Sequence, residues 1–168
     1  MLPIAAALAL ATAGADIPSQ SAETLRYFVG TWRVVSADPA GGEDLHACYT
    51  IQPFVGDMWI SGVATSKAAG FGSKDVWGVD RASGEIFRTI FDVSGAYAVV
   101  RAPSWKGDTL VLDGNVKSGG GTLRVRETVR RLSEHEFKAT WEALRGGKWS
   151  AYAVETATRV PDGTCNVS

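Results

Sequence analysis

Residues 121–143 read GTLRVRETVRRLSEHEFKATWEA, and this stretch alternates apolar and polar side chains in two runs around a short polar connection. Alternation of this kind is typical of a β-strand with one buried face, because successive side chains point to opposite sides of a sheet. Two such runs joined by a polar segment indicate a hairpin. The stretch therefore predicts two antiparallel strands, 121–132 and 136–143.

The same pattern continues along the chain from residue 30 onward. Short β-branched and aromatic runs are separated by clusters of Gly, Ser, Pro and Asp, which tolerate the backbone angles of tight turns. Before them, Leu25, Phe28 and Val29 lie at helical spacing and predict one short helix over 19–28. The expected strands are 31–37, 46–54, 58–67, 74–80, 85–92, 96–102, 108–117, 121–132, 136–143 and 148–160.

About ten hairpin-linked strands are expected to close on themselves, since closure pairs both edge strands. The chain has 168 residues, of which 45% are hydrophobic and 21% charged, a composition that fits one globular domain with a substantial core. We therefore predict an all-β fold, an antiparallel up-and-down β-barrel with a short N-terminal helix. A two-layer sandwich fits the same pattern and is the alternative.

The more apolar side of each strand is expected to face the barrel interior. In the fifth expected strand, this criterion selects the side of Phe87 and Phe91 and leaves Arg88 outside. In the ninth, it selects the side of Phe137 and Trp141. A small barrel either fills this interior with side chains or keeps a cavity for one ligand, and the sequence leaves both open.

The N-terminal residues 1–15 form an apolar stretch rich in Ala and Leu that ends just before the first charged residue, Asp16. The stretch is too short to span a bilayer and offers small residues for cleavage, which is the pattern of a signal peptide. A buried N-terminal helix is the alternative. We expect a mature domain over 16–168 that is secreted or periplasmic, with no membrane span.

The chain contains two cysteines, Cys48 and Cys165. In an exported protein an even number of cysteines favours a disulfide over free thiols. A redox or metal site would need closer spacing of its thiols. We therefore expect a Cys48–Cys165 disulfide that ties the C-terminal tail to an early strand.

A family resemblance covers residues 25–160. The stretch 25–32, LRYFVGTW, resembles the entry of lipocalin-like calycins, in which a helix is followed by a Gly-x-Trp motif. The whole region is similar to the bacterial family of lipocalin-like domains of unknown function called DUF1579, which implies a lipocalin-like barrel over 16–168. The further stretches that carry this similarity are WKGDTLV at 105–111, FKATWE at 137–142 and TATR at 156–159.

The resemblance has two implications for individual residues. In calycins the first-strand Trp packs under an Arg of the last strand, so Trp32 and Arg159 are expected to form a structural cation–π pair. The related nitrobindin-like barrels hold haem through a His near the C-terminus. This chain has only His46 and His135, neither of them in that position, so no cofactor is expected.

Two carboxylates interrupt apolar strand faces. Glu127 shares its side of the strand with Leu123, Val125 and Val129, and Glu155 is expected to follow Trp149, Ala151 and Ala153 in the same way. A buried carboxylate must be paired or neutral. If both acids line the interior together with Arg131, the next residue on that side after Val129, they would bind the polar head of a ligand or act as acid and base in an enzyme. An internal salt bridge is the structural alternative.

We expect a small hydrophobic or amphipathic molecule to bind between the aromatic walls of the barrel. The segment 69–73 is expected to be a flexible loop, so that Phe71 and Trp105 would lie on loops at the mouth. A filled barrel with a structural or protein-interaction role and a hydrolase or isomerase are the alternatives, and no catalytic residue is assigned. The candidate ligand-binding residues are Trp59, Phe71, Tyr97, Trp105, Glu127, Trp141 and Glu155.

The charge pattern excludes several kinds of partner. Seventeen Lys and Arg against eighteen Asp and Glu give a formal charge of −1, so no long-range field attracts nucleic acid. Arg124, Arg126 and Arg130 share one side of a strand and are expected on the outer face, paired with acids such as Glu136 or Glu142. No cluster of His, Cys and Asp at metal spacing occurs, and no metal site is expected.

Overall fold

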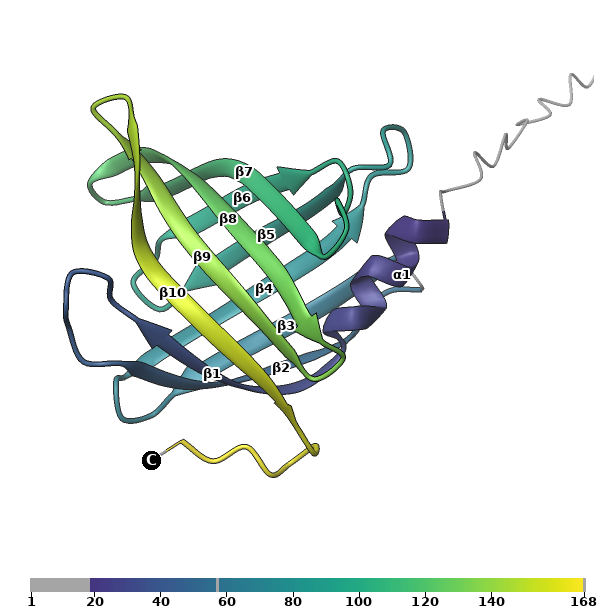
Figure 1. Ribbon diagram of the computed structural model, residues 1–168, viewed down its shortest axis with the longest axis horizontal. Helices are drawn as coiled ribbons and strands as arrows, with labels where there is room; N and C mark the ends of the chain where they lie inside the picture. The colour runs from purple at the N-terminus through teal and green to yellow at the C-terminus, as the bar shows by residue number, and fades with distance from the viewer. Residues whose placement is uncertain (1–18, 57, 168) are drawn as a thin grey trace, which may run out of the picture.

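The computed structural model describes residues 19–56 and 58–167, which form a single β-barrel preceded by one helix (Figure 1). The expected signal peptide, 1–15, lies outside the described residues. The elements are α1 (Ser19–Phe28), β1 (Gly30–Ala37), β2 (Leu45–Pro53), β3 (Trp59–Ser66), β4 (Phe71–Val79), β5 (Ile86–Asp92), β6 (Tyr97–Ala102), β7 (Thr109–Ser118), β8 (Gly121–Ser133), β9 (Glu136–Arg145) and β10 (Lys148–Val160).

The ten strands pair antiparallel in chain order, and the sheet closes where β1 pairs with both β2 and β10. Trp32 marks the closure, because it lies opposite Tyr49 on one side and Arg159 on the other. Closure leaves no edge strand, which removes a site for aggregation. The predicted up-and-down barrel with a short helix is confirmed, and the sandwich is excluded.

One strand boundary differs from the prediction in a way that matters for the site. Residues 69–73 were expected to be a loop, but β4 begins at Phe71, which lies opposite Ser66 of β3. The turn is tight, because Gly70 adopts a φ of +60° and its N–H bonds to the Lys67 carbonyl at 3.2 Å. The loop prediction is wrong, since the glycine supplies a hairpin turn and leaves the following residues free to pair.

Side chains of α1 fill one end of the barrel, called here the helix end. Leu25 and Phe28 are 1% exposed, and the Phe28 ring stacks on Trp77 at 4.8 Å and on Trp105 at 6.0 Å between ring centres. Contacts between aromatic rings in these geometries add to the burial of their apolar area. No helix in the described part of the chain is long and apolar enough to cross a membrane.

Arg159 fixes the junction between the helix and β1. Its guanidinium lies 4.1 Å from the Trp32 ring centre and donates to the carbonyls of Val29 and Tyr27 at 2.5 and 2.7 Å. These are carbonyls at a helix C-terminus, which attract a cation. Gly30 adopts a φ of +131°, and a Cβ atom there would overlap the guanidinium. The predicted Trp32–Arg159 pair is confirmed, and it explains the glycine of the Gly-x-Trp motif.

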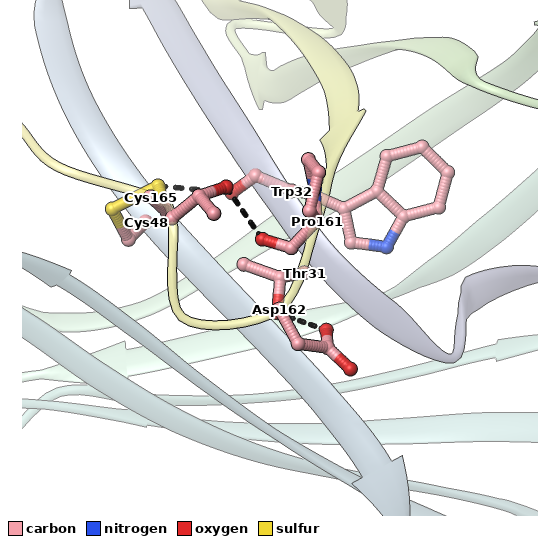
Figure 2. Close-up of a disulfide and its surroundings, with 7 residues drawn as sticks. Thr31, Trp32, Cys48, Pro161, Asp162 and Cys165 are labelled. Carbon is pink, nitrogen blue, oxygen red and sulfur yellow. Dashed lines mark hydrogen bonds between the residues drawn. A yellow bond between two sulfur atoms is a disulfide. The ribbon is translucent and has the colours of Figure 1, made fainter.

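The C-terminal tail crosses the outside of β1 and β2 and is held there by the predicted disulfide (Figure 2). Cys48 on β2 bonds to Cys165, which lies 117 residues later. Thr31 on β1 adds a hydrogen bond to the Asp162 carboxylate at 2.7 Å. The disulfide is therefore confirmed, and it joins the end of the chain to the strands where the barrel closes.

β10 contains an extra residue that reverses its faces. Across β9, Ala151 pairs with an outward-facing residue, whereas Ala153 pairs with the inward-facing neighbour of that residue. Ala153 and Glu155 therefore face the interior. Trp149 faces outward, where the Arg126 guanidinium lies 4.5 Å from its ring centre. The expectation that Trp149, Ala151 and Glu155 share a face is wrong, because a β-bulge shifts the alternation by one.

Candidate functional site

Arg88 lies inside the barrel, contrary to the prediction from strand alternation. It pairs with Trp77 and Val100, both fully buried, whereas Phe91 on the other side of β5 is 51% exposed. Counting apolar side chains within β5 gave the wrong face, because an interior position accepts a guanidinium when other strands supply its partners. The partners come from β2, β4 and β8, which are distant in sequence.

Every nitrogen of the Arg88 guanidinium bonds to a buried acceptor. Nη1 donates to both oxygens of Glu127 at 2.7 and 2.8 Å, and Nε donates to Asp75 Oδ2 at 2.7 Å. Nη2 lies 2.6 Å from the same Asp75 oxygen and donates to the Tyr49 hydroxyl at 3.2 Å. The Trp77 ring packs against the guanidinium with its centre 4.4 Å away. Four hydrogen bonds and one further ion-pair contact thus hold the guanidinium in place.

Asp75 is the acceptor at the centre of this network. Its Oδ2 also accepts the Tyr49 hydroxyl proton and the Trp77 Nε1–H, the latter at 3.1 Å. Its Oδ1 is buried without a hydrogen-bond partner among the described residues. Gly62 on β3 makes room for this arrangement, since a Cβ atom there would overlap both Asp75 Oδ1 and the Tyr49 ring. We call Tyr49, Asp75, Trp77, Arg88 and Glu127 the buried charge cluster.

Glu127 and Arg131 were considered together as residues of one interior site, but the structure places them apart. Glu127 is 2% exposed, as expected, but Arg88 holds it. Arg131 lies near the helix end, 4.3 Å from the Tyr27 ring centre and 3.9 Å from that of Trp105. Cation–π contacts of this kind stabilise a guanidinium without a carboxylate.

Burial and neighbouring charges oppose each other in the cluster, and the net result is a raised pKa for both Glu127 and Arg88. Burial raises the pKa of Glu127, and the opposing effect of Arg88 is smaller. Burial disfavours the charge of Arg88, but Glu127, Tyr49 and Asp75 outweigh it and raise its pKa well above the usual value. Arg88 is therefore a permanent cation.

Glu155 on β10 is partly buried next to this cluster, and its pKa lies close to neutral pH. Burial and then the charge of Glu127 raise the pKa of Glu155 to about 7, although Arg88 acts the other way. Glu155 forms no ion pair with any described residue. The carboxyl group therefore changes its charge near neutral pH.

This pKa predicts how stability depends on pH. In the unfolded chain Glu155 ionises near its ordinary pKa, whereas the folded protein holds the proton up to about pH 7. The folded state therefore binds more protons between these values, and its stability falls as pH rises through them, by at most about 3 kcal/mol. Urea unfolding of Glu155→Gln should lack this part of the fall, so that the variant gains on the wild type from pH 4.5 to 8. Parallel pH curves for the two proteins would contradict the assignment.

A cavity of about 320 Å³ opens at the end of the barrel opposite the helix end, called here the open end. Arg88, Trp141 and Glu155 form its floor, where the charge cluster begins. Below the floor lies a void of about 20 Å³ that Tyr49, Glu127 and Glu155 also line, enough for about one water molecule. The walls and rim of the cavity are Phe71, Ser73, Ile90, Asp92, Ala96, Tyr97, Ala98, Val116, Tyr152 and Ala153.

The cavity brings together four of the seven predicted ligand-binding residues, namely Phe71, Tyr97, Trp141 and Glu155. Glu127 lies just beneath it, at the void. Two do not belong to it. Trp59 lies on the outer face of the barrel against Phe87, with ring centres 5.2 Å apart, and Trp105 packs at the helix end.

Sequence reasoning missed Tyr49, Asp75, Trp77, Arg88 and Tyr152. Asp75 carried a usable signal, because it shares its side of β4 with Trp77 and Val79 just as Glu127 interrupts the apolar face of β8. Arg88 carried an ambiguous signal, because Ile86 and Ile90 share its side of β5 while Phe87 and Phe91 share the other side. His46 and His135 are both exposed, and the described residues contain no group of three His, Cys, Asp or Glu side chains that could hold a metal ion.

The outward arginines on β8 are paired in part as expected. Arg126 bonds to Glu142 on β9 at 2.8 Å, as predicted. Arg124 bonds to Asp113 on β7 at 2.9 Å rather than to an acid on β9. Pairs at such exposure contribute little to stability.

The fold and the cavity define a single-chain β-barrel that is filled at one end and hollow at the other. The crystal structure of Rv2717c from M. tuberculosis is similar to it, with a TM-score of 0.56 over 86% of this chain and 99% of that chain at 13% identity. That similarity shows a shared barrel fold. No protein-family model matches this chain, and no curated protein sequence matches it.

Two further solved structures resemble the barrel more distantly. The redesigned barrel mFAP1 bound to DFHBI has a TM-score of 0.42 over 84% of this chain and 100% of that chain, at 16% identity. The structure of EF1p2_mFAP2b bound to DFHBI has a TM-score of 0.43 over the same shares, at 17% identity.

Proposed function

We propose that this protein is a lipocalin-like carrier of the DUF1579 kind, secreted or periplasmic, that binds a small amphipathic molecule in the cavity at its open end. The observation that carries the proposal is the cavity itself, about 320 Å³ with apolar walls above a charged floor. Small-molecule sites are typically concave, mostly apolar and equipped with a few polar groups, at volumes of roughly 300–1,000 Å³.

The division of the barrel interior supports binding over a purely structural role. Below the floor, the aromatic side chains and the charge cluster of the described residues enclose the small void. Above it, the small side chains of Ala98 and Ala153 leave the cavity open. Because paired strands form its walls, the cavity exists before a ligand arrives, and binding needs little ordering of the protein.

The disulfide supports the proposed compartment. Disulfides persist in secreted and periplasmic proteins, where the surroundings are oxidising, and are rare in the cytosol. Cys48 and Cys165 are joined in the folded protein. Export through the N-terminal segment 1–15 agrees with this chemistry and remains part of the proposal.

Ligand binding is tested by substituting a wall residue with a larger side chain that fills the cavity. Ala153→Phe places a ring inside the cavity, whereas Ala151→Phe places the same ring outside on the same strand. We expect the neutral dye N-phenyl-1-naphthylamine to bind the wild type saturably with increased fluorescence. Ala153→Phe should weaken that binding at least tenfold, and Ala151→Phe should leave it within twofold.

Thermal unfolding of both variants serves as the control, because only folded protein is compared. A wild type without saturable dye binding would count against the proposal. So would an Ala153→Phe variant that melts like the wild type and binds the dye equally well. Loss of binding in the inward variant alone supports the cavity as the site.

A further inference from the structure

The part of the barrel interior that the cavity reaches has more acidic groups than basic ones. Asp75, Glu127 and Glu155 lie at or beneath its floor against the guanidinium of Arg88, whereas Arg131 and Arg159 lie at the helix end. A fourth carboxylate, Asp92, lies at the rim. Among the described residues that line the cavity, Arg88 is the only basic side chain. A ligand entering from the open end therefore meets an acidic surface.

Arg88 does not offer a free donor to a ligand. Its N–H groups bond to Glu127, Asp75 and Tyr49, and one face of the guanidinium is covered by Trp77. An anionic head would have to displace one of these buried acceptors, which would leave that acceptor without its partner. Arg88, the cation on the floor, is therefore engaged by the protein's own acceptors and does not bind a carboxylate or phosphate ligand.

Glu155 is the group left for a ligand. It lines both the cavity and the void beneath it and pairs with no cation among the described residues. The Trp141 side chain lies beside it on the floor and hydrogen-bonds to it, with Tyr152 at the rim. A carboxylate with aromatic side chains beside it is a favourable setting for an ammonium group, which gains an ion pair with the carboxylate and cation–π contacts where it meets an aromatic face.

We infer that the cavity selects amphipathic molecules whose head is a protonated amine and disfavours those with a carboxylate or phosphate head, with Glu155 as the recognising group. This inference rests on the proposed ligand-binding function. It adds the chemical class of the ligand, which the volume of the cavity alone does not give.

The titration of Glu155 adds a pH dependence to this recognition. Glu127 on β8, Arg88 on β5, Asp75 on β4 and Tyr152 on β10 are the ionisable groups that act on it, and its partners on β1 and β9, Ser36 and Ala139, carry no charge. Together with burial they place its pKa at about 7. An ammonium head should therefore bind more tightly at pH 8 than at pH 5.5, by about tenfold or more, since Glu155 must lose its proton.

The test compares three probes with one apolar body, namely octylammonium, octanol and octanoate, as competitors of N-phenyl-1-naphthylamine at pH 8. We expect octylammonium to displace the dye at concentrations at least tenfold lower than octanol, and octanoate to be the weakest. Glu155→Gln should remove the advantage of octylammonium and leave octanol within twofold. Glu142→Gln, on the outer face of β9, should change neither.

The outcomes separate this inference from the proposed function. Equal displacement by octylammonium and octanol, or a preference for octanoate, overturns the inference while the carrier function stands. Loss of the octylammonium preference in Glu155→Gln supports it, provided that octanol still binds the variant. A wild type that binds neither dye nor any probe fails the proposed function and the inference with it.

Discussion

Replacing Arg88 with methionine should lower the free energy of unfolding by about 3–5 kcal/mol, because a cation is lost while two buried carboxylates remain. Asp75 and Glu127 are each 2% exposed, and Arg88 is the cation that both contact. In a domain of this size the loss corresponds to a fall in melting temperature of roughly 6–20 °C. Urea unfolding at pH 7 measures it directly.

The matched control is Arg126→Met. Like Arg88, Arg126 bonds to a glutamate; its partner is Glu142 on the adjacent strand β9, at 2.8 Å. The Arg126 side chain, however, is 32% exposed on the outer face. Removing an exposed pair of this kind should cost less than about 1 kcal/mol. An equal fall in the free energy of unfolding of the two variants would contradict the claim that burial makes the Arg88 ion pairs more important for stability.

A second experiment separates two causes of the lower stability of Arg88→Met: the loss of the contacts of Arg88, and the negative charge left on Asp75 and Glu127. The triple variant with Arg88→Met, Asp75→Asn and Glu127→Gln removes both fully buried carboxylates together with the cation. The triple variant should recover part of the stability that Arg88→Met loses, because neutral amides are cheaper to bury than anions. A triple variant less stable than Arg88→Met would contradict the electrostatic explanation.

Removing the disulfide should lower the free energy of unfolding by about 2–5 kcal/mol, mainly because the unfolded chain regains the freedom that a closed loop denies it. The loop is long, because Cys48 and Cys165 are 117 positions apart in the sequence. The double variant Cys48→Ser, Cys165→Ser measures the effect in urea. The folded barrel should survive, since the bond holds only the tail against β1 and β2.

Two controls accompany the cysteine variant. Thiol alkylation of the wild type under denaturing conditions without reductant should label neither cysteine. The near-ultraviolet circular dichroism of the double variant should match the wild type, which places the effect in the unfolded state. Unchanged stability in the double variant would mean that the tail contributes nothing beyond its own contacts.

The barrel was largely predictable from the sequence, because most strands alternate apolar and polar residues and the hairpins between them contain typical turn residues. The stretch 121–143 alone indicates two paired strands, and ten such strands favour closure. Glu127 was placed inside correctly for the same reason, since its neighbours on that face are apolar.

The site was less predictable, because its decisive features depend on pairing between strands. The inward position of Arg88 follows from carboxylates 13 and 39 residues away, which no pattern within β5 reports. The bulge between Ala151 and Ala153 leaves the composition of β10 unchanged and shifts only its pairing with β9. Trp59 and Trp105 show the same limit, since being aromatic does not reveal which face or which end a residue occupies.

Among the described residues, Phe28, Trp77 and Trp105 pack against one another at the helix end, whereas the cavity opens at the other end of the barrel. A molecule bound in the cavity therefore enters and leaves past Tyr97 and Tyr152. Association and dissociation therefore cross one common barrier. A bulkier rim would slow loading and unloading in equal proportion and lengthen residence time without changing affinity, so retention and strength of binding can vary separately in this architecture.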